Sequence, residues 1–435
     1  MLIRLIFFSL LLIPTALLAQ KVSKLQLKLE AQAKTLEPQV IEWRRKFHQT
    51  PELSNRENQT GAFIADYLKS LGMEVQYPVA KTGVVALLST GKPGPVVALR
   101  ADMDALPITE RNSLPFASNV KTNFGGQETG VMHACGHDAH MAMLMAVAKI
   151  LSDNKKELKG MVKFIFQPAE EGVGPEESPA GAELMVKEGV LENPKVDAIF
   201  GLHIQSLLPS GTLSYRPGAL MSAVDGFDVK VKGKGAHGAT PWEGIDPIVV
   251  ASEIVNGLQT IVSRQTVLTE AAAVITVGTF HAGIRRNIIP DEAFLQGTIR
   301  TFGPQSQKRV HEKIKLTATK IAEASGATAE VNINIMYPAT INDAKLTEKM
   351  IPSLEKAAGK EKVMVIPAVT MAEDFSFYQQ KVPGFFFFLG AYPAEMKLER
   401  KPTHHTADFM IDENSFSVGV KALLNLTVDY LTSSK

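Results

Sequence analysis

The densest group of potential metal ligands in this sequence lies between Met132 and His140. These nine residues contain three histidines, one aspartate and the only cysteine of the chain, Cys135. Thiolate and imidazole are common ligands of zinc and of similar divalent ions. A lone cysteine is usually a small buried apolar residue, and a lone histidine is usually a satisfied polar one. A cluster of this density nevertheless favours metal binding over chance.

Two different segments flank this cluster and must position it. Residues 121–130 are polar and glycine-containing, and we interpret them as a loop. Residues 141–151 are apolar and have helical length and propensity. Cys135 and His137 are two residues apart, too close for one face of a helix. A loop or a first helical turn can direct both side chains to one point. The segment alone matches none of the usual spacings of zinc ligands, so the remaining ligands must come from elsewhere in the chain.

Pairs of acidic residues follow two strands that we expect to be buried. They are Asp102 and Asp104 after residues 95–100, and Glu170 and Glu171 after residues 161–166. Open α/β sheets place their sites at the carboxyl ends of such strands. The aspartates suit either a turn or the support of a metal. The glutamates suit either a solvated acidic loop or a pair in which one binds a metal while the other moves a proton.

Further histidines lie at positions that suit a site. His203 ends the predicted buried strand 197–203, which repeats the pattern of a polar residue at a strand tip. His237 lies in a glycine-rich loop and is either a turn residue or a donor toward a substrate. His404 and His405 are adjacent, and the chemistry of the sequence does not choose between them as ligands.

Hydrophobic periodicity divides the chain into an interrupted domain and an inserted one. Residues 20–221 and 337–435 contain helices and buried strands, which predicts an α/β catalytic domain with a mixed, mainly parallel sheet flanked by helices. Residues 222–336 contain half-exposed strands and two helices in β-α-β-β-α-β order, which predicts an inserted α+β domain of the ferredoxin-like type.

Composition and the amino terminus bear on location and partners. The chain has 435 residues, of which 45% are hydrophobic, and a net charge of +1, so nothing electrostatic favours nucleic acid. Residues 1–19 resemble a cleaved secretory signal, with Arg4, a short apolar core and Ala19. The alternative is an uncleaved anchor, but the apolar run is shorter than the roughly 18 residues of a spanning helix. We therefore expect a periplasmic or secreted protein with no stable membrane span.

The motifs taken together resemble a known family. They are His-Ala-Cys-Gly-His-Asp (133–138), Gln-Pro-Ala-Glu-Glu-Gly (167–172), Gly-Leu-His (201–203) and Asn-Ile-Ile-Pro-Asp (287–291). Over nearly all of residues 38–432, the chain resembles the di-metal amidohydrolases and metallopeptidases that include hippurate hydrolases, indoleacetyl-amino-acid hydrolases and N-acyl-amino-acid deacylases. It is most similar to their cysteine-containing branch. The resemblance implies two divalent ions per subunit, which would be manganese, zinc, nickel or cobalt.

The resemblance also implies roles for individual residues. The metal ligands would be Cys135 as a bridge, His137 and His203 on one ion, and Glu171 and His405 on the other. Glu170 would act as the general base. Asp104 would orient a ligand from behind.

The inserted domain resembles the lid and dimerisation domain of that family, which implies a homodimer. His237 and Asn287 would then reach the active site of the partner subunit and polarise the scissile carbonyl. Trp242 stands where the family commonly has histidine, and the loop at residues 173–180 is expanded. Both departures concern the choice of substrate.

Three functions compete on this basis. The leading hypothesis is an exported amidohydrolase that cleaves N-acyl or aryl-acyl amino acids. A dipeptidase or carboxypeptidase is the close alternative, because a dipeptide has the same amide bond and terminal carboxylate. A non-catalytic periplasmic binding protein on the same fold is the third, but the presence of Glu170 argues against it.

Overall fold

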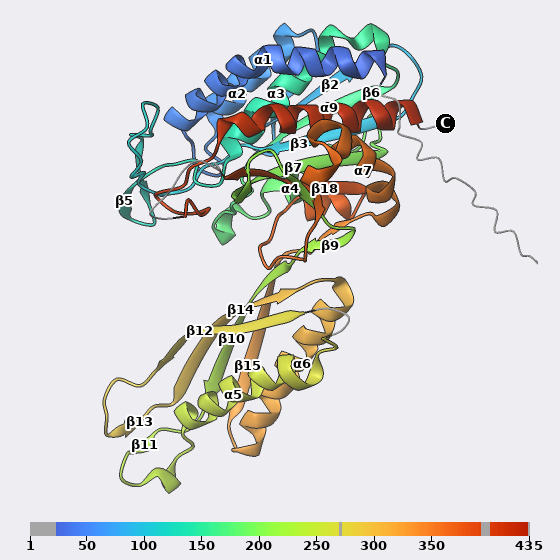
Figure 1. Ribbon diagram of the computed structural model, residues 1–435. Coiled ribbons are helices and arrows are strands. Elements are labelled where there is room, and N and C mark those ends of the chain that lie inside the picture. Colours follow the sequence, from blue (N-terminus) through green and yellow to red (C-terminus); the bar gives the residue numbers. More distant parts are fainter. Residues whose placement is uncertain (1–22, 269–271, 393–400, 434–435) are drawn as a thin grey trace, which may run out of the picture.

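The computed structural model describes residues 23–268, 272–392 and 401–433, which form a larger and a smaller body (Figure 1). The signal segment predicted at residues 1–19 lies outside these ranges. Within them, no helix combines the length and the apolar character needed to cross a bilayer.

An eight-stranded mixed sheet forms the centre of the larger body. Its strands, in spatial order, are β1 (Glu74–Val79), β2 (Gly83–Ser89), β6 (Met161–Gln167), β3 (Val96–Asp102), β7 (Ala198–Pro209), β18 (Gly384–Tyr392), β8 (Leu213–Tyr215) and β17 (Val363–Val365). The inner strands β6, β3, β7 and β18 are parallel. At one edge, β2 pairs antiparallel with β6, and β1 pairs antiparallel with β2. The predicted mixed, mainly parallel sheet is confirmed.

Helices cover both faces of this sheet. One hydrophobic core is shared by α1 (Lys24–Gln49), α2 (Asn58–Ser70), α3 (His137–Asp153), α7 (Ala344–Ala358) and α9 (Phe416–Ser433). The other face packs against the short helices α4 (Gly181–Lys187) and α8 (Ser376–Gln379). Helix α3 is apolar nearly all round, so it must be buried on every side. In Figure 1 it lies between α1 and the sheet, with its first turn at the carboxyl end of the parallel strands.

The smaller body has the predicted β-α-β-β-α-β order. Its antiparallel sheet contains β12 (Ala273–Ala282), β14 (Glu292–Thr301), β10 (Ala223–Lys232) and β15 (Thr328–Tyr337), and α5 (Pro247–Gln265) and α6 (Pro304–Ala324) pack on one face. This strand order is that of a ferredoxin-like fold. Tyr337, which we assigned to the second catalytic segment, instead ends the last strand of this sheet.

Two short strands connect the bodies. β9 (Gly218–Met221) leads out of the larger body, β16 (Thr340–Asn342) returns to it, and the two pair with each other. The opposite end of the smaller body is formed by β11 (Ala236–His237) and β13 (Ile288–Ile289), which point away from the larger body in Figure 1.

The segment at residues 121–130 is not the loop that we expected. It forms a hairpin of β4 (Lys121–Phe124) and β5 (Gln127–Gly130). Its turn contains Gly125 and Gly126 with φ of 59° and 81°, the conformation that a two-residue hairpin turn requires. The strands are mostly exposed and polar, so no apolar alternation marked them. The Gly-Gly pair was the available signal.

Candidate metal centre and active site

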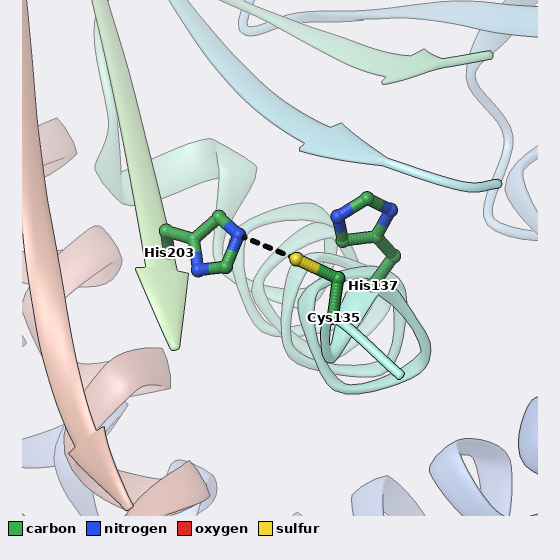
Figure 2. A group of neighbouring side chains, drawn as sticks. All are labelled: Cys135, His137 and His203. Atoms are coloured by element: carbon green, nitrogen blue, oxygen red, sulfur yellow. Dashed lines mark hydrogen bonds between the residues drawn. The ribbon is translucent and has the colours of Figure 1, made fainter. Parts of the chain in front are cut away.

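Gly136 allows Cys135 and His137 to face the same space. Its φ is 96°, in the left-handed region, and α3 begins at the next residue. A Cβ atom here would also lie 2.3 Å from Cγ2 of Ile204, so both conformation and space require glycine. The sulfur of Cys135 lies 3.3 Å from Nε2 of His203, which projects from β7 (Figure 2).

Cys135, His137 and His203 form the first group of potential ligands. One donor atom from each lies within 4.8 Å of the other two. His137 donates from Nδ1 to the carbonyl oxygen of Asp104 at 2.9 Å, while its buried Nε2 has no hydrogen-bond partner among the described residues. His203 donates from Nδ1 to the carbonyl oxygen of Ile204 at 2.6 Å. Burial, with the neighbouring histidines, lowers the pKa of His203 well below its usual range, which favours the neutral, metal-binding form.

Cys135, Glu171 and His405 form a second group around the same sulfur. Nε2 of His405 lies 3.2 Å from Oε1 of Glu171, and that oxygen is buried without a hydrogen-bond partner among the described residues. The adjacent His404 also approaches Cys135, with Nδ1 3.7 Å from the sulfur. Its Nε2, however, accepts a hydrogen bond from the amide of Ser206 at 3.1 Å.

The donor set fits a pair of divalent ions. Burial, followed by the charges of Glu171 and Glu170, raises the pKa of the Cys135 thiol well above its usual range. A cation on each side of the sulfur would reverse this preference, because coordination deprotonates a thiol. The unpartnered atoms of His137 and Glu171 then also gain a partner. The two groups share Cys135, which is the arrangement of a bridging ligand.

A third cluster, Asp102 with His137 and His140, is better explained by hydrogen bonds. The carboxylate of Asp102 accepts from Arg100 at 2.7 Å and from Nδ1 of His140 at 2.5 Å. Nε2 of His140 accepts from the amide of Ile204 at 2.8 Å. Both ring nitrogens of His140 are therefore used, and this histidine supports the strand that carries His203.

Glu170 lies beside the ligands in an acidic, buried environment. Its carboxylate is within 4.8 Å of those of Glu373 and Asp374, and Arg100 contacts both of these at 2.9 Å. Burial, and then the charge of Glu373, raises the pKa of Glu170 well above its usual range. Glu170 lines a cleft of about 420 Å³ together with Cys135, Glu171, His203 and His405. Its other walls include the apolar side chains Met221, Met371 and Phe388.

His237 and Asn287 are brought together, but not at this cleft. His237 pairs with Ile288 between β11 and β13, and the amide of Gly238 donates to the carbonyl oxygen of Asn287 at 3.0 Å. Both residues line a separate depression. The strands β11 and β13 lie at the end of the smaller body that is far from the larger one (Figure 1). Within one chain they do not meet Cys135. Their expected contribution to a partner's active site stays a prediction.

Several residues of the site were missed from the sequence. We assigned no role to Arg100, His140 or Tyr337, although each contacts the acidic or ligand-bearing segments. An arginine within an otherwise apolar strand is a usable signal, because a buried guanidinium requires several acceptors. Glu373 gave no such signal, because its neighbour Glu170 is 203 positions away in the sequence.

The mixed sheet with sulfur, imidazole and carboxylate donors at its carboxyl edge defines the class of metal-dependent hydrolases acting on amide or peptide bonds. Residues 98–429 match the family described as Peptidase family M20/M25/M40, and the chain belongs to this family. The predicted family and the predicted class of hydrolase are confirmed.

Individual relatives cover almost the whole chain. N-acetyl-L-cysteine deacetylase of Bacillus subtilis (strain 168) is 41% identical over 383 residues, which are 88% of this chain and 85% of the relative. Thermostable carboxypeptidase 2 of Saccharolobus solfataricus is 39% identical over 410 residues, which are 93% and 98% of the two chains. The crystal structure of Bacillus subtilis YXEP protein, a dinuclear metal binding peptidase from the M20 family, is 36% identical, with a TM-score of 0.77 over 92% of this chain and 100% of that one.

Proposed function

We propose that this protein is an exported metal-dependent amidohydrolase that cleaves the amide bond of N-acyl or aryl-acyl amino acids. One observation carries the proposal. The sulfur of Cys135 is shared by two groups of ligand atoms, and Glu170 lies beside both groups at the cleft. Export rests on the character of residues 1–19.

The residues of the two groups would hold two divalent ions. The predicted ion pair is confirmed by the family, by the ligand groups and by the dinuclear metal binding relative, whereas the identity of the metal stays a prediction. Cys135, His137 and His203 would hold one ion, and Cys135, Glu171 and His405 the other. When bound, such ions lower the pKa of water toward about 7 and polarise a carbonyl group.

Glu170 is proposed as the general base. It would accept a proton from the attacking water at its carboxylate and deliver that proton to the nitrogen of the leaving amine. Burial raises the pKa of Glu170 above its usual range, which favours a carboxyl group that can hold the proton between the two transfers. The positive charge of Arg100 opposes this rise.

The smaller body is proposed to complete the active site of a second subunit. His237 lies in β11 and Asn287 directly precedes β13, and these paired strands point away from the larger body (Figure 1). In a homodimer joined through this body, they would donate hydrogen bonds to the oxygen of the scissile carbonyl. Such donors act where negative charge develops in the transition state.

The cleft favours a substrate with an apolar acyl group. Met221, Met371 and Phe388 line it beside the ligand groups, and flexible methionine side chains adapt to acyl groups of different shape. The deacetylase relative supports an N-acyl amino acid. The carboxypeptidase relative supports a second candidate function, hydrolysis of peptides at the carboxyl terminus.

Glu170→Gln tests the proposal on the metal-loaded enzyme. We expect the variant to retain both ions and to lose at least about 1,000-fold in kcat on N-acyl amino acids, since it cannot accept the proton. Glu128→Gln, in the exposed hairpin, is the control. Turnover by Glu170→Gln at the rate of the wild type would contradict the proposed base. A panel that compares N-acetyl and N-benzoyl amino acids with dipeptides separates the two functions by product.

A further inference from the structure

The returning connection between the two bodies contacts the segment that carries Glu170. Tyr337 is the last residue of β15 in the smaller body, and its hydroxyl donates to the backbone carbonyl oxygen of Glu170 at 2.9 Å. Its ring packs edge-on against Phe377 at 6.2 Å between centroids and also lines the catalytic cleft. A residue of the smaller body thus holds the backbone of the proposed base in the larger one.

The backbone around Glu170 requires such support. Ala169 has φ of 52°, a left-handed conformation that is uncommon for a residue with a side chain, and Gly172 has φ of 87°. The amide of Ala169 donates to Glu57 and the amide of Glu171 donates to Asp104, each at 2.9 Å. These two anchors come from the larger body. Tyr337 adds a third from the smaller one.

The two chain segments that join the bodies also donate hydrogen bonds to the backbone of the larger body. The hydroxyl of Thr340 in β16 donates to the carbonyl oxygen of Glu373 at 3.2 Å, and the carboxylate of Glu373 neighbours that of Glu170. On the outgoing side, the hydroxyl of Ser222 donates to the carbonyl oxygen of Thr370 at 2.9 Å. Both connections are therefore bonded to backbone segments that carry or precede the buried acids.

The hydroxyl of Tyr337 is a dependable donor. Burial, and then the charges of Asp374 and Glu170, raise its pKa above the usual range, so it stays protonated at any working pH. The carbonyl oxygen of Glu170 can therefore accept this hydrogen bond throughout the catalytic cycle.

We propose that Tyr337 is a positioning residue, which couples the placement of the smaller body to that of the Glu170 carboxylate. The inference rests on the proposed role of Glu170 as the base. Without the hydroxyl, the left-handed turn at Ala169 loses one of its three anchors, and the base leaves its position beside the ligand groups. Displacements of about 1 Å can lower the rate by up to about 100-fold.

Tyr337→Phe removes only the hydroxyl. We expect kcat to fall about 10-fold, while KM stays within about twofold and both ions are retained, because the ligands are unchanged and the aromatic ring at position 337 still lines the cleft. Amide hydrogen exchange at residues 169–172 should become faster, which is a readout independent of activity. Tyr77→Phe is the matched control. The hydroxyl of Tyr77 donates to the carbonyl oxygen of Asn58 at a distance of 2.9 Å, and neither residue lines the cleft.

A double variant tests whether Tyr337 acts through Glu170. In a Glu170→Asp background, where the carboxylate is already displaced, Tyr337→Phe should lower kcat by less than about twofold. Equal losses in both backgrounds, or an unchanged kcat and unchanged exchange in Tyr337→Phe, would overturn the inference. Loss of the ions or of folding in Tyr337→Phe would also overturn it, in favour of a purely structural role. If Glu170 is not the general base, the Glu170→Gln variant will still turn over, and this result is independent of the Tyr337 variants.

Discussion

The carboxylate of Asp104 contacts His137 on the side of the ring opposite to Nε2: its Oδ1 lies 3.2 Å from Nδ1 of that histidine. The other oxygen, Oδ2, accepts from the amide of Glu171 at 2.9 Å and from the hydroxyl of Ser54 at 2.7 Å. One side chain therefore orients a proposed ligand of each ion, and it leaves Nε2 of His137 free to coordinate.

Asp104→Asn should weaken metal binding by about 10- to 100-fold. The side-chain amide of asparagine can place an N–H group opposite the backbone N–H of Glu171, and it fixes the tautomer of His137 less firmly than the carboxylate does. Titration of the metal-free protein in chelator-buffered solutions measures the affinity. Ser54→Ala removes only the third hydrogen bond and should change the affinity by less than about threefold. Equal affinities in Asp104→Asn and the wild type would show that this contact does not orient the ligands.

Gly136→Ala should destabilise the protein by at least about 2 kcal/mol and lower its metal content. The substitution combines a left-handed φ with a contact of 2.3 Å to Ile204. Gly125→Ala provides the control, since Gly125 also has a positive φ but open space around its Cα, and should cost about 1 kcal/mol. Chemical denaturation and metal analysis measure both effects. Similar losses in the two variants would mean that the contact with Ile204 relaxes.

Asp138→Asn should show a pH-dependent loss of stability. The buried carboxylate accepts from Arg44 and from His48 at 2.8 Å each. Burial alone would raise the pKa of Asp138, but Arg44 and His48 outweigh it and hold the pKa below its usual range. Since the unfolded value is about 3.9, the stabilisation is complete above about pH 4 and is lost as the pH falls below it.

We therefore expect Asp138→Asn to cost about 3 kcal/mol at pH 7 and progressively less below about pH 4. Unfolding of the metal-free protein should be followed, because metal binding is itself pH-dependent and would add its own contribution to stability. Asp66→Asn, which breaks an exposed pair with Lys69, should change stability by less than about 1 kcal/mol. A constant difference between wild type and Asp138→Asn from pH 3 to pH 7 would rule out this linkage.

Mixing two inactive variants tests whether active sites are shared between subunits. His237→Ala should lower kcat about 100- to 1,000-fold without loss of metal. If His237 serves the partner's site, a dimer of one His237→Ala chain and one Glu170→Gln chain contains one intact site. Random re-association should then restore about a quarter of the wild-type activity. No restoration in verified mixed dimers would place His237 outside the partner's site.

The sequence was informative where chemistry and local pattern coincide. Cys135 and His137 stand out by type, and Glu170 and Glu171 by their place after a buried strand. The alternation of buried strands and helices predicted the sheet. These signals are local, and the motifs that link them along the chain were specific enough to indicate a family.

Other features depend on contacts that no local pattern records. The role of His140 became visible only through its bonds to Asp102 and to the amide of Ile204, 64 positions away. The Tyr337 contact with Glu170 spans 167 positions and links two bodies. The location of His237 shows a limit of another kind, because its predicted role depends on a second subunit that a single chain does not contain.

Anomalous diffraction from crystals of the metal-loaded protein tests the central claim most directly. The account predicts two ions in each subunit, one contacting Cys135, His137 and His203 and the other contacting Cys135, Glu171 and His405, with the sulfur bonded to both. Metal–sulfur distances should be about 2.3 Å for zinc. A single ion, or ions held by Glu170, Glu373 and Asp374 with Cys135 unligated, would contradict it.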